Sequence, residues 1–192
     1  MNIVLGVSGS ISAYKAADVT SALVKKGHDV QVVLTDGGSR FITALTLQTL
    51  SKRRVETDPF TESDPSVVKH IEMAQWADVV AVVPASADII GKAASGIADD
   101  LLTSTIVAAA NQAVMVMAPA MNTNMYENPI VQGNMEKLRG YGFRFIEPKS
   151  ALLACGTRGK GALADVDVIV EYLDSIDSRE GSCPGEERNE EN

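Results

Sequence analysis

An asparagine that follows an apolar run has a type and a position suited to chemistry. Asn122 lies in the stretch 118–126, which reads Ala-Pro-Ala-Met-Asn-Thr-Asn-Met-Tyr and directly follows the apolar run 113–117. The run is typical of a buried strand, and Pro119 ends it because proline lacks the amide hydrogen that a central ladder needs. Ligands bind at the carboxyl ends of strands in an open parallel sheet, so Asn122 is placed to hold a substrate. The alternative is that Asn122 only caps or turns the following segment.

A turn of glycine and serine near the start of the chain has the pattern of an anion site. Residues 8–10, Ser-Gly-Ser, follow the β-branched run 3–7 and precede a helical pattern over 11–26. Backbone amides and the helix dipole both face a phosphate bound at such a place. The spacing of Gly6 and Gly9 is not a full dinucleotide fingerprint, and no P-loop lysine is in place. An ordinary tight turn is the alternative.

Two further side chains are candidates for proton transfer. His70 follows a charged, proline-containing loop over 52–69, and its titration range suits proton handling. Cys155 lies in the glycine-rich segment 151–161, where a loop can fold over a ligand and a thiol can react. The alternatives are a packing or helix-start histidine and a buried, inert thiol.

The rest of the pattern predicts the scaffold that must position these residues. Strands are expected over 3–7, 30–35, 78–84, 113–117 and 143–146. Helices are expected over 11–26, 39–50, 86–95, 101–110, 129–138 and 165–173. Strands that alternate with helices imply parallel pairing with right-handed crossovers. We therefore predict an α/β domain with a mainly parallel sheet.

Size, charge and composition restrict the class of protein. The chain has 192 residues and a net charge of -8, with scattered lysines and arginines, so we expect no nucleic-acid partner. No apolar run is long enough to cross a bilayer, and the start lacks the basic segment of a secretory signal, so we expect a cytoplasmic protein without a membrane partner. Residues 1–176 are expected to form the domain. The acidic segment 177–192, which includes Cys183, is expected to be a disordered tail.

Six segments, taken in order, form one specific pattern. They are residues 6–15, 70–71, 84–92, 96–102, 119–125 and 154–156. Together they resemble the flavin-containing cysteine decarboxylases, and within them the branch that acts on phosphopantothenoylcysteine in coenzyme A biosynthesis. The resemblance covers about residues 1–175 and implies a Rossmann-like (flavodoxin-like) three-layer sandwich. The chain departs from the family pattern at Asp88, where Asn is usual, at Tyr126, where Trp is common, and after Lys160.

The resemblance implies FMN as the cofactor, and it assigns roles to individual residues. Cofactor contacts are implied for Gly9, Ser10, Ile11, Thr35, Ser86, Ser104 and Thr105. Substrate contacts are implied for Met121, Asn122, Met125 and Ala154. His70, Asn122 and Cys155 are the implied catalytic set, and no metal is implied.

The implied reaction converts 4'-phosphopantothenoylcysteine into 4'-phosphopantetheine. A cysteine carboxylate has no neighbouring group that accepts the electrons left by carbon dioxide, and oxidation of the thiol to a thioaldehyde supplies one. Decarboxylation then gives an enethiol, which is reduced, so the cofactor carries the difficult step.

The resemblance also implies a homo-oligomer, either a trimer or a dodecamer built from trimers, with sites between neighbouring subunits. From the length of the sequence we expect no ligase domain of the kind that is fused to many bacterial relatives. Three alternatives are a peptidyl-cysteine decarboxylase acting on a ribosomal peptide, a prenyl-transferring flavin enzyme and a non-catalytic regulatory flavoprotein. A prenyl transferase gives no reason for Asn122 and Cys155 together.

Overall fold

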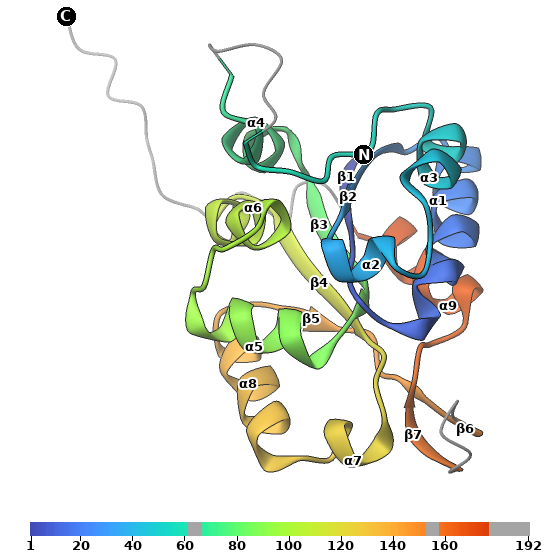
Figure 1. Ribbon diagram of the computed structural model, residues 1–192, viewed down its shortest axis with the longest axis vertical. Coiled ribbons are helices and arrows are strands. Elements are labelled where there is room, and N and C mark those ends of the chain that lie inside the picture. Colours follow the sequence, from blue (N-terminus) through green and yellow to red (C-terminus); the bar gives the residue numbers. More distant parts are fainter. Residues whose placement is uncertain (61–66, 153–157, 177–192) are drawn as a thin grey trace, which may run out of the picture.

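A five-stranded parallel sheet is the middle layer of the structure, which is a computed structural model (Figure 1). Its strands are β1 (Asn2–Val7), β2 (Asp29–Leu34), β3 (Val79–Ala85), β4 (Val114–Pro119) and β5 (Arg144–Phe145). They lie in the order β2-β1-β3-β4-β5, and every neighbouring pair is parallel. This is the flavodoxin-like order, in which the direction of winding reverses beside β1. The predicted fold class is confirmed.

The structure describes residues 1–60, 67–152 and 158–176. The predicted tail over 177–192 therefore lies outside the described residues, as do Ala154 and Cys155. In the part of the chain that is described, no helix is long and apolar enough to cross a membrane.

The apolar runs form strands because helices cover both of their faces. Leu5 of β1 pairs with Val32 of β2 and Ala81 of β3, and all three are fully buried. Alternate residues of one strand belong to different cores, so that Leu5 packs on one side of the sheet and Val4 on the other. A strand that is buried on both sides has no polar face, which explains the continuous apolar runs.

Two layers of helices enclose the sheet (Figure 1). On one face lie η1 (Ile11–Lys15), α1 (Ala16–Lys25), α3 (Ala44–Ser51) and α9 (Val166–Asp174). On the other face lie α4 (Lys69–Trp76), α5 (Ala87–Ser95), α6 (Leu101–Ala109) and α8 (Pro129–Gly140).

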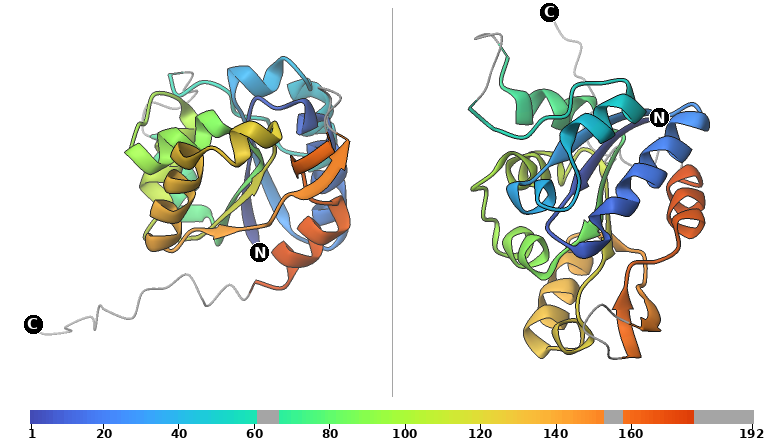
Figure 2. Two further views of the ribbon diagram at one scale, coloured as in Figure 1. Left: turned by 90° about the horizontal axis from the view of Figure 1, so that it is seen from below. Right: turned by 45° about the vertical axis from the view of Figure 1, so that its right-hand side comes forward.

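Short elements gather at the carboxyl ends of the strands, as the view from below in Figure 2 shows. They are α2 (Asp36–Ser39), α7 (Thr123–Tyr126), and an antiparallel hairpin of β6 (Lys149–Leu152) and β7 (Arg158–Ala162). Three helices that follow strands begin here with a polar cap: Thr35 caps α2, Ser86 caps α5 and Asn122 caps α7. These caps bring hydroxyl and amide groups to one edge of the sheet because each satisfies the first free amides of its helix.

Two predicted helices differ from the observed ones. The helix expected over 11–26 begins with the 3₁₀ segment η1, a tighter geometry that is frequent at helix starts. The helix expected over 39–50 begins later, as α3, because Thr43 caps it by accepting the amide of Thr46 at 3.2 Å, and residues 36–39 form the separate short helix α2. The helices expected to end at 26 and 95 do end there within one residue, and the glycines that follow, Gly27 and Gly96, both have a positive φ.

The segment 151–161 was predicted to be a glycine-rich loop, but its described residues belong to the two strands of a hairpin. Residues on either side of 153–157 pair as strands β6 and β7. Glycines are tolerated in β7 because its backbone approaches α7 closely: a β-carbon on Gly159 would overlap the side chain of Thr123. The prediction placed these glycines in a loop that can fold over a ligand, whereas Gly159 allows β7 to pack closely on α7.

Candidate active site

Two hollows open side by side at the carboxyl edge of the sheet. The first, which we call the Thr35 hollow, has a volume of about 500 Å³, and its walls include Ser8, Gly9, Thr35, Gly37, Ser86 and Lys92. The second, the Asn122 hollow, has a volume of about 530 Å³, and its walls include Gly9, Ser10, Ile11, Ser86, Met121 and Asn122. Both volumes suit a small ligand. Gly9 and Ser86 line both hollows, so ligands in the two would be neighbours.

The Thr35 hollow lies where the loops after β1 and β2 meet. The Thr35 hydroxyl donates to the Val7 carbonyl at 3.2 Å and accepts the Gly38 amide at 3.0 Å. Gly9 faces Gly37 so closely that a β-carbon on Gly9 would lie 3.1 Å from the Gly37 Cα. Glycine is needed at this contact because a side chain would push the loops apart.

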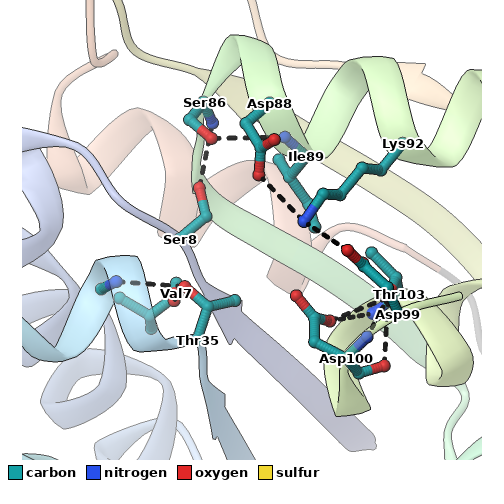
Figure 3. Close-up of polar contacts among 11 residues, drawn as sticks. Val7, Ser8, Thr35, Ser86, Asp88, Ile89, Lys92, Asp99, Asp100 and Thr103 are labelled. Carbon is teal, nitrogen blue, oxygen red and sulfur yellow. Dashed lines mark hydrogen bonds and ion pairs between the residues drawn. The ribbon is translucent and has the colours of Figure 1, made fainter. Parts of the chain in front are cut away.

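Ser8 joins the loop after β1 to the loop after β3. Its hydroxyl donates to the Pro84 carbonyl at 2.8 Å and accepts the Ser86 amide at 3.0 Å, and the residue is buried. The Ser86 hydroxyl in turn accepts the Ile89 amide at 3.3 Å (Figure 3). The wall shared by the two hollows is therefore held by hydrogen bonds between segments that are distant in the sequence.

Charged side chains form the outer wall of the Thr35 hollow (Figure 3). Lys92 Nζ lies 3.1 Å from an Asp99 carboxylate oxygen and 3.5 Å from one of Asp88. The hydrogen bond with Asp99 raises the pKa of Lys92, so the ammonium stays charged. Asp100 caps α6 by accepting the Thr103 amide at 2.7 Å. Asp88, which departs from the family pattern, therefore has a cation beside it.

The Asn122 hollow combines an amide, apolar side chains and two lysines. Asn122 Oδ1 accepts the Asn124 amide at 2.8 Å, so the capping role that was left open is confirmed. Large apolar side chains that remain exposed line this hollow: Ile11, Tyr14, Met125 and Leu152. Lys15 and Lys149 lie on its wall, and Lys149 also pairs with Asp165. A hollow of this composition suits an anionic ligand with apolar parts.

The structure brings most of the predicted binding residues together. Thr35 lines the first hollow, Gly9 and Ser86 line both, and the second holds Ser10, Ile11, Met121, Asn122 and Met125. Their assignment as cofactor or substrate residues stays a prediction.

Among the described residues, three predicted site residues line neither hollow. Ser104 and Thr105 line neither, and the buried Thr105 hydroxyl donates to the Leu101 carbonyl at 2.7 Å as part of its own helix. His70 also lines neither; it lies on α4, which Figure 1 shows at the end of the molecule opposite to α7. Within one chain, His70 and Asn122 therefore do not share a hollow.

Sequence reasoning assigned no binding role to four residues of the walls. Lys92 and Asp88 are spaced four apart on a helix, which was a usable signal for their ion pair. Ser8 was noted only as part of a turn, and its bonds to the loop after β3 have no local signature. Lys149 had no signal, because its place depends on the hairpin.

The fold and these hollows define a doubly wound α/β protein with adjoining ligand sites at the carboxyl edge of its sheet. A match to the flavoprotein family covers residues 1–177, and the chain belongs to that family.

Relatives with assigned names make the likeness more specific. Over 183 residues the chain is 47% identical to the coenzyme A biosynthesis bifunctional protein CoaBC of Bacillus subtilis, a match that covers 95% of this chain and 45% of that protein. The chain thus spans less than half the length of this relative. It is also 47% identical to a probable phosphopantothenoylcysteine decarboxylase of Streptococcus mutans, over 90% of this chain and 96% of that protein.

A solved structure has the same fold. It is a PPC decarboxylase with a cysteine-to-serine mutation, complexed with pantothenoylaminoethenethiol. The TM-score is 0.81 and the identity 31%, and the match covers 90% of this chain and 96% of that one.

The hollows fit the prosthetic group that the family name implies. A flavin nucleotide needs a polar place for its phosphate and an apolar place for its ring. The loop after β1 supplies the first, because Gly9 and Ser10 line the Asn122 hollow and Ser10 caps η1 by accepting the Ser12 amide at 3.3 Å. Exposed Ile11 and Tyr14 supply the second.

Proposed function

We propose that this protein is an FMN-dependent decarboxylase that converts 4'-phosphopantothenoylcysteine into 4'-phosphopantetheine in coenzyme A biosynthesis, in the cytoplasm. One observation supports this function above all: the Asn122 hollow shares Gly9 and Ser86 with the Thr35 hollow. A substrate held by Asn122 would therefore lie against a flavin whose phosphate is held by the loop after β1. The similarity to the S. mutans and B. subtilis proteins supports the same reaction and pathway.

The cofactor residues have separate tasks in this proposal. Gly9 and Ser10 hold the phosphate end of FMN at the start of η1, and Thr35 and Ser86 supply hydroxyls beside it. Ile11 packs against the flavin ring. When bound, FMN accepts two electrons from the substrate thiol and later returns them, which makes the overall reaction redox neutral.

Asn122 orients the substrate by hydrogen bonding to its carboxylate or amide. The bond from Asn124 fixes the plane of the carboxamide, and its NH₂ group is a donor suited to an anion. Met121 and Met125 pack against the apolar part of the substrate, and Lys15 and Lys149 supply the positive charge that a phosphorylated substrate requires. A substrate held in this way loses carbon dioxide once its thiol has become a thioaldehyde.

His70 and Cys155 act on protons in the same proposal. His70 orients the carboxylate or serves as a base, and Cys155 donates the proton when the enethiol is reduced. Since His70 and Asn122 do not share a hollow in one chain, the active site is completed by a neighbouring subunit. We therefore also propose a trimer, or a dodecamer of trimers.

The decisive experiment is incubation of the FMN-loaded protein with 4'-phosphopantothenoylcysteine and detection of 4'-phosphopantetheine by mass spectrometry. Formation of product with release of one carbon dioxide per substrate is the expected result. A peptide that ends in cysteine is offered in competition; preference for the peptide would favour the peptidyl-cysteine alternative. A well-folded, FMN-loaded protein that turns over neither compound would overturn the proposal.

A further inference from the structure

Glu147 lies between three elements, of which α7 and the β6–β7 hairpin contribute to the wall of the Asn122 hollow. It follows β5 closely, and its carboxylate accepts the Tyr126 hydroxyl of α7 at 3.0 Å and the Lys160 ammonium of β7 at 2.7 Å, both at Oε2. Its Oε1 accepts the Arg139 guanidinium of α8 at 3.2 Å. One side chain therefore links α7, α8 and the hairpin.

Electrostatic effects at this cluster agree with the contacts. The hydrogen bond from Lys160 lowers the pKa of Glu147, and the same bond raises the pKa of Lys160. Burial and the bond to Glu147 raise the pKa of Tyr126. At neutral pH the cluster therefore holds a carboxylate, an ammonium and a neutral phenol, and the ammonium also lies 5.4 Å from the Tyr126 ring centre.

Backbone contacts continue from this cluster to the neighbours of Asn122. The Met121 amide donates to the Gly161 carbonyl at 2.9 Å, and β-carbons on Gly159 or Gly161 would overlap Thr123 or Met121. The position of β7 thus fixes the residues on both sides of Asn122.

We propose that Glu147 is a positioning residue that holds the β6–β7 hairpin against α7. It thereby sets where the two strands that flank Cys155 in the sequence stand relative to Asn122. The effect on the reaction rests on the proposed function, because it concerns the same site. The effect on the position of the hairpin is independent of the proposed function.

Hydrogen exchange tests the structural part of the proposal, that Glu147 holds the hairpin against α7. Glu147→Gln keeps the size of the side chain and removes its charge, and we expect amide exchange at Met121 and in β7 to become about fivefold faster. Lys160→Met should have the same effect, the double variant no more than either single variant, and Lys160→Arg little effect. Glu136→Gln is the matched control: Glu136 lies on α8 and pairs with Arg139 of the same helix at 2.5 Å, whereas Glu147 pairs directly with Lys160 of the hairpin. Unchanged exchange in Glu147→Gln would overturn the proposal.

A single-turnover experiment tests the functional part of the proposal, that the position of the hairpin affects the reaction. FMN-loaded protein is used in excess over substrate. If the hairpin moves, proton delivery from Cys155 suffers more than the loss of carbon dioxide. The enethiol, which is two hydrogens lighter than the normal product, should then accumulate about fivefold more in Glu147→Gln than in Glu136→Gln. The two electrons removed from the thiol remain on the flavin in this experiment, so the step is balanced. The flavin content of the variants should match that of the wild type.

The two experiments separate the possible failures. If the wild type makes no product, the proposed function fails, while hydrogen exchange still decides whether Glu147 holds the hairpin. If the wild type is active and exchange becomes faster in Glu147→Gln, but the share of enethiol does not change, the positioning role is overturned.

Discussion

Asn122 caps a helix and lines a hollow at the same time, and this double position gives a clean test of its role. Asp caps helices about as well as Asn, so Asn122→Asp should keep α7 and leave the melting temperature within about 1 °C of the wild type. The new carboxylate repels the carboxylate of the substrate, and kcat/KM should fall about 100-fold.

Steady-state kinetics together with a melting curve checks this prediction for Asn122. Asn128→Asp is a suitable control, because Asn128 also caps a helix, α8, and lies outside both hollows. Wild-type kinetics in Asn122→Asp would exclude Asn122 as the anchor of the substrate.

Cys155 lies outside the described residues, so its role is tested by chemistry. If its thiol protonates the enethiol, Cys155→Ser should still release carbon dioxide in a single turnover but yield a product two hydrogens lighter. Mass spectrometry of the product and trapping of the carbon dioxide measure both halves. Formation of the normal product would remove Cys155 from the reduction step.

At the scale of elements, the hairpin is the part of the site whose attachment should respond to acid. The pKa of Glu147 is lowered in the folded protein, so its contribution to stability is present above the ordinary glutamate pKa and is lost as the pH falls through the folded value. Glu147 is half exposed, which limits this contribution through solvent screening.

The melting temperature of Glu147→Gln should therefore lie about 1 to 2 °C below that of the wild type at pH 7. The difference should shrink as the pH falls below about 4.3, the ordinary glutamate pKa. Thermal denaturation of both proteins over a series of pH values measures it. A difference that is independent of pH would show that the charge of Glu147 is not what matters.

At the scale of the whole molecule, the separation of His70 from Asn122 predicts complementation between subunits. His70→Asn and Asn122→Asp should each be nearly inactive and still retain flavin. In a cyclic trimer whose sites combine His70 of one subunit with Asn122 of the next, a randomly mixed assembly restores about a quarter of the sites. Activity after unfolding and refolding an equal mixture of the two variants is the measurement, and each variant refolded alone is the control. No recovery in a properly assembled mixture would contradict a site shared between subunits.

The residues that begin and end helices show which features of the fold the local sequence can predict. The helix predicted over 86–95 is observed as α5 with nearly the same ends, because the Ser86 hydroxyl and the positive φ of Gly96 act within a few residues. The start of α3 at Thr43 was missed, although it is equally local, because the apolar pattern continued through it. The candidate site was predictable only to the extent that its residues follow strands.

The sequence by itself determined the strands, most of the helices and the edge of the sheet at which Gly9, Ser86 and Asn122 meet. Continuous apolar runs and strand-end prolines suffice for that, since each acts over a few residues. Only the tertiary structure decided that Gly9 touches Gly37, that Glu147 joins Tyr126 to Lys160, and that His70 lies away from Asn122. These relations join segments distant in the sequence, and their geometry is set by how the helices and the hairpin pack on the sheet.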